Sequence, residues 1–197
     1  MKKKEWVLRE ILYQVLEKGR VFLTQEFLSD KCGVSLGNVN YTLKTLESMS
    51  AIEKKAKGFT VTNPKKILVY WASIRNLTAD IVFKTSSKLS VKEIEELMPP
   101  SLFTAYSGYK FLFGSVPSDY SEVFVYGDPE EIKKRFPREG KIDNIFVLKM
   151  DEHLKKFRRI PIAQLYVDLW NINTWYAQEF LKALEARIDG ILERIGH

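Results

Sequence analysis

A group of polar side chains recurs along residues 38–48, and their amide, hydroxyl and ammonium groups are suited to contacts with DNA. An Asn amide can pair with two atoms of adenine, a Lys can reach the acceptors of guanine, and a Thr methyl can touch thymine. Hydroxyl and ammonium groups can also bind phosphate, which positions a protein without reading a sequence. We therefore predict DNA contacts by Asn38, Asn40, Tyr41, Lys44, Thr45 and Ser48.

The spacing of apolar residues places this polar group on one side of a helix. Apolar residues recur at intervals of three, four and three positions, which predicts a buried stripe of Leu36, Val39, Leu43 and Leu46. The Ser35 hydroxyl can cap the start of this helix. Glu47 is the only acid between Ser35 and Met49, so the outward face should carry positive charge.

A shorter helix should precede this one and form a helix-turn-helix with it. Thr24 can cap the first helix, and Gly33 can supply the positive φ that the turn between the helices needs. A glycine turn followed by a helix with a polar outer face is typical of helix-turn-helix DNA-binding proteins. The pattern also occurs in small helical subdomains that bind no DNA.

Residues 51–61 read as two short strands around a basic turn, in the position that a wing occupies after a helix-turn-helix. Lys54, Lys55 and Lys57 lie in this hairpin and are predicted to bind phosphate. Lys2, Lys3 and Lys4 are expected to add phosphate contacts from the start of the chain. The sequence therefore predicts a winged helix.

The charge of the chain is concentrated in the same region. Residues 1–76 hold 14 Lys and Arg against 7 Asp and Glu, whereas residues 77–197 hold 17 against 18. The net charge of +6 thus belongs to the first part of the chain. A basic part beside a neutral one indicates that a polyanion binds at the first.

The order of predicted elements indicates an α+β protein. We expect a winged-helix domain over 1–63, a connector helix over 64–77 that begins at Asn63-Pro64, and an α/β domain over 78–197. In the last domain, strands are predicted at 79–85, 122–126 and 144–150. Helices are predicted at 90–97, 103–113, 162–170 and 175–195, and the last is the best candidate for a homodimer contact.

Composition excludes several classes of protein. No apolar run is long enough for a transmembrane helix, and the charged N-terminal stretch does not resemble a signal peptide, so a cytoplasmic protein is expected. Cys32 is the only cysteine and should serve packing. His153 and His197 are far apart, so no metal site is expected. We predict no cofactor and no catalytic residue.

One segment nevertheless resembles a catalytic pattern. Nucleotidyltransferases follow an apolar-Gly-Ser loop with two carboxylates at i and i+2 on one strand, which hold a divalent metal against phosphates. Gly114-Ser115 fits the loop and Glu122 fits the first carboxylate, but Phe124 occupies the second. The domain after residue 78 is therefore open to interpretation as a degenerate nucleotidyltransferase-like fold or as a plain strand after a loop.

Two polar residues stand in an otherwise apolar helix near the end of the chain. Gln164 and Asp168 are four positions apart and so lie on one helix face. One interpretation is a structural tie to a neighbouring loop. The other is a cleft that binds a protein partner or ligand, and we predict Gln164 and Asp168 as partner-binding residues on that basis.

The layout resembles the AbiEi-type antitoxins, which are transcriptional regulators of type IV toxin–antitoxin systems. The resemblance covers about residues 22–184 and is carried by the winged helix, the connector Pro64–Ala72, the run Phe103–Tyr109 and, most specifically, Gln164–Leu169. It implies that the winged helix binds operator DNA and represses its own operon. It also implies that the C-terminal domain helps to neutralise a toxin.

Together these patterns predict a DNA-binding transcriptional regulator, with duplex operator DNA, a cognate toxin and a second copy of the chain as candidate partners. Two other functions stay open. One is a metal-dependent nucleotidyltransferase that uses Glu122, and the other is a winged helix that binds protein instead of DNA.

Overall fold

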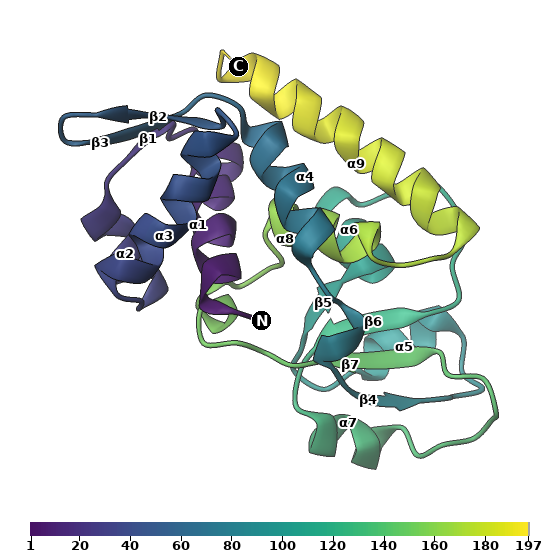
Figure 1. Ribbon diagram of the computed structural model, residues 1–197. Coiled ribbons are helices and arrows are strands. Elements are labelled where there is room, and N and C mark those ends of the chain that lie inside the picture. The colour runs from purple at the N-terminus through teal and green to yellow at the C-terminus, as the bar shows by residue number, and fades with distance from the viewer. Residues whose placement is uncertain (197) are drawn as a thin grey trace. The chain divides into compact units, whose positions relative to one another are not determined.

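A computed structural model describes residues 1–196 (Figure 1). The fold is α+β, as predicted. The chain forms two compact units: the first comprises residues 1–75, 161–167 and 184–197, and the second comprises residues 76–160 and 168–183. This division differs from the predicted ranges 1–63, 64–77 and 78–197, because two late segments and most of the expected connector belong to the first unit.

The first unit begins with three helices and three strands. In chain order these are α1 (Lys3–Lys18), β1 (Phe22–Leu23), α2 (Gln25–Cys32), α3 (Leu36–Ser48), β2 (Ile52–Lys55) and β3 (Gly58–Val61). The strands form a sheet of order β1-β3-β2, and both pairs are antiparallel (Figure 1). This is the element order and strand pairing of a winged helix-turn-helix.

The predicted caps explain where α2 and α3 begin and where α2 ends. The Thr24 hydroxyl accepts a bond from the Phe27 amide at 3.2 Å, and the Ser35 hydroxyl accepts one from the Asn38 amide at 3.3 Å. Gly33 ends α2 with φ 62°, the left-handed conformation that a glycine adopts without strain. The turn between the helices is thus fixed by the residues that the sequence indicated.

The buried stripe of α3 differs from the prediction at one position. Val39, Leu43 and Leu46 are buried, but Leu36 is 48% exposed. Thr42, which the stripe did not include, is fully buried, and its hydroxyl is satisfied by donating to the Asn38 carbonyl at 2.9 Å. Leu36 is the first residue of the helix and precedes the turn that packs inward.

Helix α4 (Pro64–Ile74) and two late segments complete the first unit. The buried Trp71 donates its indole N–H to Glu5 at 3.1 Å, which ties α4 to α1. Lys65 pairs with Asp189 at 2.6 Å, and the Tyr166 hydroxyl donates to Glu185 at 3.0 Å. The first pair ties α9 (Trp175–Arg194) to α4, and the second joins the two late segments of the unit to each other.

The second unit is built on a sheet of order β4-β7-β6-β5 (Figure 1). The outer pairs are antiparallel and the central pair β6–β7 is parallel. Its buried side chains form a core that includes Ile94, Val123, Ile132 and Val147. The elements in chain order are η1 (Thr78–Asp80), β4 (Ile81–Thr85), α5 (Val91–Leu97), β5 (Leu102–Thr104), α6 (Ala105–Phe113), β6 (Val123–Tyr126), α7 (Pro129–Arg135), β7 (Ile145–Leu148) and η2 (Leu154–Lys156).

The helix predicted over 103–113 was wrong at its start. Residues 102–104 form the edge strand β5, and α6 begins only at Ala105. Thr104 pairs with Phe124 in the sheet, so the backbone groups of this segment bond to β6 instead of forming a helical turn. The last two helices lie close to prediction, with α8 at Ile162–Trp170 and α9 at Trp175–Arg194.

Gly58 allows β1 and β3 to approach each other, and replacing it should destabilise the wing. A Cβ atom at this position would lie 2.4 Å from the Leu23 carbonyl oxygen, which is backbone and cannot rotate away. We expect Gly58→Ala to lower the free energy of unfolding by about 1–3 kcal/mol, as overpacking does. Urea denaturation measures this effect.

A matched control for this prediction is Gly37→Ala in α3, where the nearest atom to a new Cβ would be the Ser35 hydroxyl at 3.8 Å. That change removes a helical glycine and should stabilise the protein by about 0.5–1 kcal/mol. Equal stability of the two variants would contradict the close approach of β1 and β3.

Candidate nucleic-acid interface

The outer face of α3 presents most of the predicted DNA-binding side chains to solvent. Asn38, Asn40, Lys44 and Ser48 are exposed, Thr45 is half-buried, and Tyr41 is 68% exposed. An exposed tyrosine offers both an apolar ring and a hydroxyl group to a binding partner. The structure therefore brings the six predicted residues of α3 onto one accessible face.

The six residues differ in what else they contact. The Asn38 amide donates to the Ser35 hydroxyl at 2.9 Å, and the Ser48 hydroxyl donates to the Thr45 carbonyl at 2.8 Å. Within residues 1–196, the Asn40 and Lys44 side chains form no hydrogen bond or ion pair. Asn40 and Lys44 can thus bind a ligand without breaking a bond inside the protein.

The wing carries three exposed lysines, two of which are paired with acids. Lys54 lies 2.5 Å from Glu47, and Lys55 lies 2.5 Å from Glu53. Both pairs are largely exposed and each should contribute at most about 1 kcal/mol, so a phosphate can displace either carboxylate. Lys57 lies in the turn between β2 and β3 and has no ion-pair partner among the described residues.

A tyrosine of α4 that the sequence did not single out joins this face. The Lys4 ammonium lies 5.6 Å from the ring centre of Tyr41 and 4.7 Å from that of Tyr70, and it also donates to the Tyr70 hydroxyl. These distances are those of cation–π contacts. The basic start of α1 is therefore held beside α3, as the predicted phosphate contacts of Lys2–Lys4 require. No sequence pattern indicated this contact, because Tyr70 lies in α4, which the wing separates from α3 along the chain.

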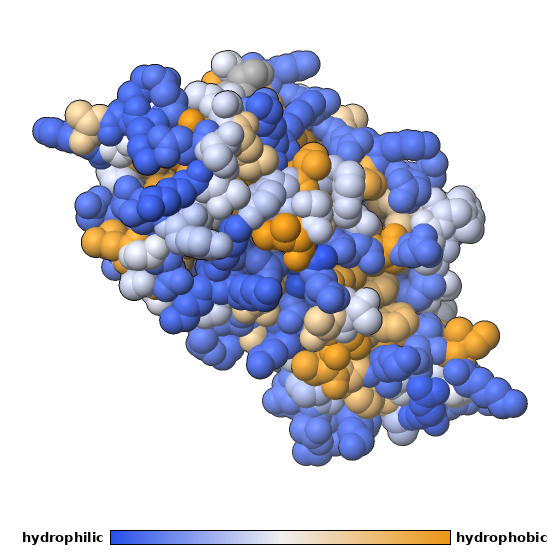
Figure 2. Space-filling view, viewed as in Figure 1, coloured by the Kyte–Doolittle hydropathy of each residue, from blue (hydrophilic) through white to orange (hydrophobic). Residues whose placement is uncertain are grey.

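The surface over these elements is mostly hydrophilic. Figure 2 shows that the β2–β3 hairpin and the neighbouring α2 and α3 present polar side chains with only isolated apolar ones. A polar surface without a continuous apolar patch is typical of protein–DNA interfaces, which are more polar than protein–protein interfaces.

Gln164 and Asp168 are fully buried, so the structure contradicts their prediction as partner-binding residues. Gln164 accepts a bond from the buried Arg9 guanidinium at 2.8 Å in the first unit. Asp168 accepts bonds from the Thr104 hydroxyl at 2.8 Å and the Tyr126 hydroxyl at 2.7 Å in the second. Both residues tie their helix to neighbouring elements, which is the structural alternative that the sequence left open.

The segment that resembles a nucleotidyltransferase pattern does not place carboxylates side by side on β6. Glu122 precedes the strand and accepts a bond from the Tyr176 hydroxyl. Phe124 occupies the second carboxylate position, is buried, and stacks on Phe146 with ring centres 4.6 Å apart. Tyr106 packs edge-on against the Phe124 ring. The second position is therefore part of an aromatic cluster.

Comparison with known proteins gives one family. Residues 2–88 are similar to the family described as Firmicute plasmid replication protein (RepL). The matched range contains α1 to α4, the wing and β4. Comparison with curated proteins and with solved structures gave no match. Among the helices that the structure describes, none has both the length and the apolar character needed to cross a lipid bilayer.

Proposed function

We propose that the chain is a sequence-specific duplex-DNA-binding protein that regulates replication or transcription. The observation that carries the proposal is the outer face of α3, where Asn40 and Lys44 are exposed without internal partners beside a lysine-bearing hairpin. A helix of this kind fits the major groove, and the wing and the α1 start are suited to flanking phosphates. This arrangement supports DNA binding over protein binding by the winged helix.

The similarity to plasmid replication proteins supports the same conclusion from a second direction. Its range, residues 2–88, includes every residue that we assign to the DNA face. We infer that the DNA is a plasmid site or an operator next to the gene for this chain and that the protein acts in the cytoplasm. The proposed role needs binding and no catalytic step, so Glu122 has no chemical part in it.

The antitoxin role implied by the AbiEi resemblance is a narrower form of this function. Its most specific residues, Gln164–Leu169, include the two buried ties Gln164 and Asp168, so that run is explained by folding without a toxin. The narrower role therefore depends on whether a neighbouring gene encodes a toxin. Growth rescue on co-expression of the two genes would support it.

Binding to the duplex upstream of its own gene, and to duplexes selected from a random pool, tests the proposal. We expect Asn40→Ala to weaken binding to the selected duplex by about 5- to 150-fold, the equivalent of one bidentate base contact. Binding to random duplex should change little, because phosphate contacts remain. Fluorescence anisotropy at low salt measures both affinities.

The control for this experiment is Asn173→Ala, an exposed Asn of the second unit that should leave both affinities unchanged. Absence of any duplex binding by the wild-type chain at low salt would overturn the proposed function. Equal loss of selected and random binding in Asn40→Ala would instead remove Asn40 from base recognition.

A further inference from the structure

Two tyrosines hold the ammonium group of Lys4, and no acid of the described chain pairs with it. The ammonium lies 4.7 Å from the ring centre of Tyr70 and 5.6 Å from that of Tyr41, and it donates a hydrogen bond to the Tyr70 hydroxyl. Within residues 1–196 the Lys4 side chain forms no ion pair. Aromatic rings attract a cation without neutralising it, so the charge of Lys4 stays available to an external anion.

Other lysines assigned to the DNA face lack this combination. Lys54 and Lys55 each pair with a glutamate, which a phosphate must displace. Lys44 and Lys57 are unpaired but exposed, so binding must order their flexible side chains at a cost in conformational entropy. Lys4 is half-buried and is already ordered by its two aromatic contacts. Its charge is therefore preorganised for binding.

The Tyr70 hydroxyl adds a second donor beside this charge. A phenol hydroxyl has one O–H donor and can also accept hydrogen bonds. Its oxygen accepts the bond from Lys4, whereas its O–H group donates to no residue that the structure describes. Because a hydrogen bond joins the ammonium and the hydroxyl, the two groups are close enough to donate to the same phosphate. Together they form an anion site with one charged and one neutral donor.

This pair of donors lies away from the wing along α3. Tyr41 of α3 contacts Lys4, and Glu47 of α3 contacts Lys54 of the wing. The six positions between Tyr41 and Glu47 correspond to about 9 Å along the helix axis. Figure 1 shows the start of α1 and the β2–β3 hairpin towards opposite ends of α3. A helix in the major groove, which is about 12 Å wide, has a phosphate backbone on each side.

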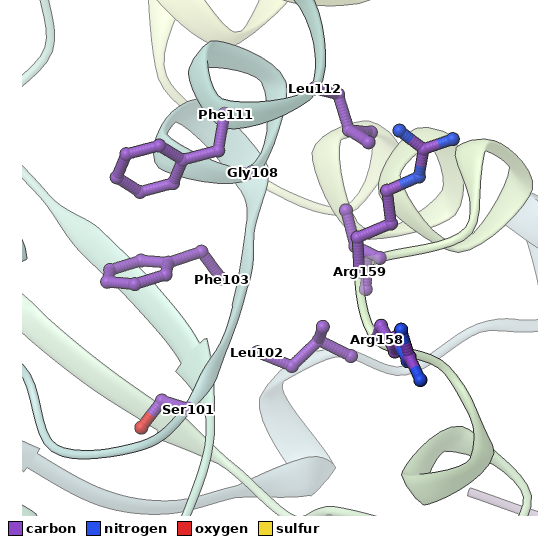
Figure 3. A pocket seen from close by; sticks show the side chains of 9 residues that line it. Ser101, Leu102, Phe103, Gly108, Phe111, Leu112, Arg158 and Arg159 are labelled. Atoms are coloured by element: carbon purple, nitrogen blue, oxygen red, sulfur yellow. The ribbon is translucent and has the colours of Figure 1, made fainter.

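Unpaired cations in the second unit do not converge in this way. Arg158 and Arg159 form no hydrogen bond or ion pair with any described residue, and they border a cavity of about 250 Å³. Figure 3 shows the rings of Phe103 and Phe111 directed away from both arginines, whose guanidinium groups point apart. Exposed charge alone therefore does not indicate a site, and Lys4 differs by the donor and the rings gathered around it.

We propose that Lys4 and Tyr70 together bind one phosphate of the duplex, on the side of α3 away from the wing. The site rests on the duplex binding proposed above and extends the DNA contact to α4, which follows the winged helix in the chain. A phosphate contact of this kind fixes the position of α3 in the groove without reading a base.

The test is a set of anisotropy titrations of the full chain on the selected duplex at several salt concentrations. We expect Lys4→Ala to reduce the slope of log K against log salt by about 0.9 and the affinity about 8-fold at 0.1 M salt. Tyr70→Phe keeps the ring under the ammonium and removes the hydroxyl. It should weaken binding about tenfold, as loss of one hydrogen bond to a charged group does, and leave the slope unchanged because a neutral donor releases no counterion.

A double variant shows whether the two groups share one phosphate. The loss of affinity in Lys4→Ala with Tyr70→Phe should be smaller than the product of the two single losses, because each group then donates to the same acceptor. Losses that multiply would show two separate contacts and would overturn the shared site. Lys4→Arg keeps the charge and should keep the wild-type slope.

The same helix supplies a matched control. The Lys18 ammonium lies 5.3 Å from the ring centre of Tyr13, so this pair also joins a lysine to a tyrosine ring. Lys18 is fourteen positions from Lys4, about 21 Å along α1, and neither Lys18 nor Tyr13 belongs to the DNA face. Lys18→Ala and Tyr13→Phe should leave affinity and slope unchanged. Circular dichroism of each variant verifies folding.

The outcomes separate this site from the function on which it rests. Absence of duplex binding by the wild-type chain at low salt would overturn the proposed function and this site with it. Wild-type binding that Lys4→Ala and Tyr70→Phe leave unchanged would overturn this site alone. Equal loss of slope in Lys4→Ala and Lys18→Ala would also overturn it, because overall charge would then explain the effect.

Discussion

Replacing Asp168 with alanine should lower the free energy of unfolding by about 2–5 kcal/mol. The carboxylate accepts bonds from the Thr104 and Tyr126 hydroxyls, and all three residues are fully buried. Without the carboxylate both hydroxyls lose their acceptor in a place that water does not reach, and each unsatisfied group costs about 1–3 kcal/mol. Urea denaturation followed by circular dichroism measures the loss.

A double-mutant cycle with Thr104→Val distinguishes this bond from general loss of packing. Valine keeps the shape of threonine and removes the donor, so it should cost less in the Asp168→Ala background than in the wild type. Additive losses would show that Thr104 and Asp168 act independently, against the bond that the structure shows.

The second large effect is expected on DNA affinity. Replacing Lys44, Lys54, Lys55 and Lys57 together with alanine should reduce the slope of log K against log salt by about 3.6, if each lysine neutralises one phosphate. The same four contacts are worth about 10³–10⁴-fold in affinity at 0.1 M salt. Anisotropy titrations of one duplex between 0.05 and 0.2 M salt, roughly the range where such slopes are measured, supply both values.

Net charge is held constant by a control in the second unit. Lys92, Lys133, Lys155 and Lys182 are exposed there, and their joint replacement removes the same four charges. We expect this variant to keep the wild-type slope, since the slope counts only the cations that neutralise phosphates directly. If both quadruple variants reduce the slope by the same amount, the salt dependence results from the overall charge of the protein and not from local lysine–phosphate contacts.

The local features of the first unit could be predicted because short-range chemistry determines them. Thr24, Gly33 and Ser35 cap or end helices by contacts within a few residues, and a sequence shows these directly. The exposure of Leu36 could not be predicted in this way, because burial of the first helical residue depends on which turn of α3 meets the neighbouring helices. The place of Tyr70 on the DNA face could not be predicted either, because its contact with Lys4 joins residues that are far apart in the chain.

The ties made by α8 show the same limit more sharply. The spacing of Gln164 and Asp168 indicated a shared helix face, yet their partners are Arg9 in the first unit and Thr104 and Tyr126 in the second. Nothing in the apolar periodicity identifies these partners, so a buried polar pair and a binding cleft look alike in the sequence. The start of α6 was missed for a related reason: β5 is only three residues long and exists because β6 lies beside it.

The discontinuous make-up of the first unit has a consequence for how the chain folds during synthesis. Arg9 is made early, but Gln164, which binds it, leaves the ribosome only after the whole of residues 76–160. In the nascent winged helix, the Arg9 side chain therefore stays hydrated until Gln164 has been synthesised. Contacts between residues that lie so far apart in the chain also form slowly. A messenger cut between codons 76 and 160 yields a polypeptide that carries the whole DNA face but lacks the segments that complete its unit. The first unit is complete only when both of its late segments have been translated.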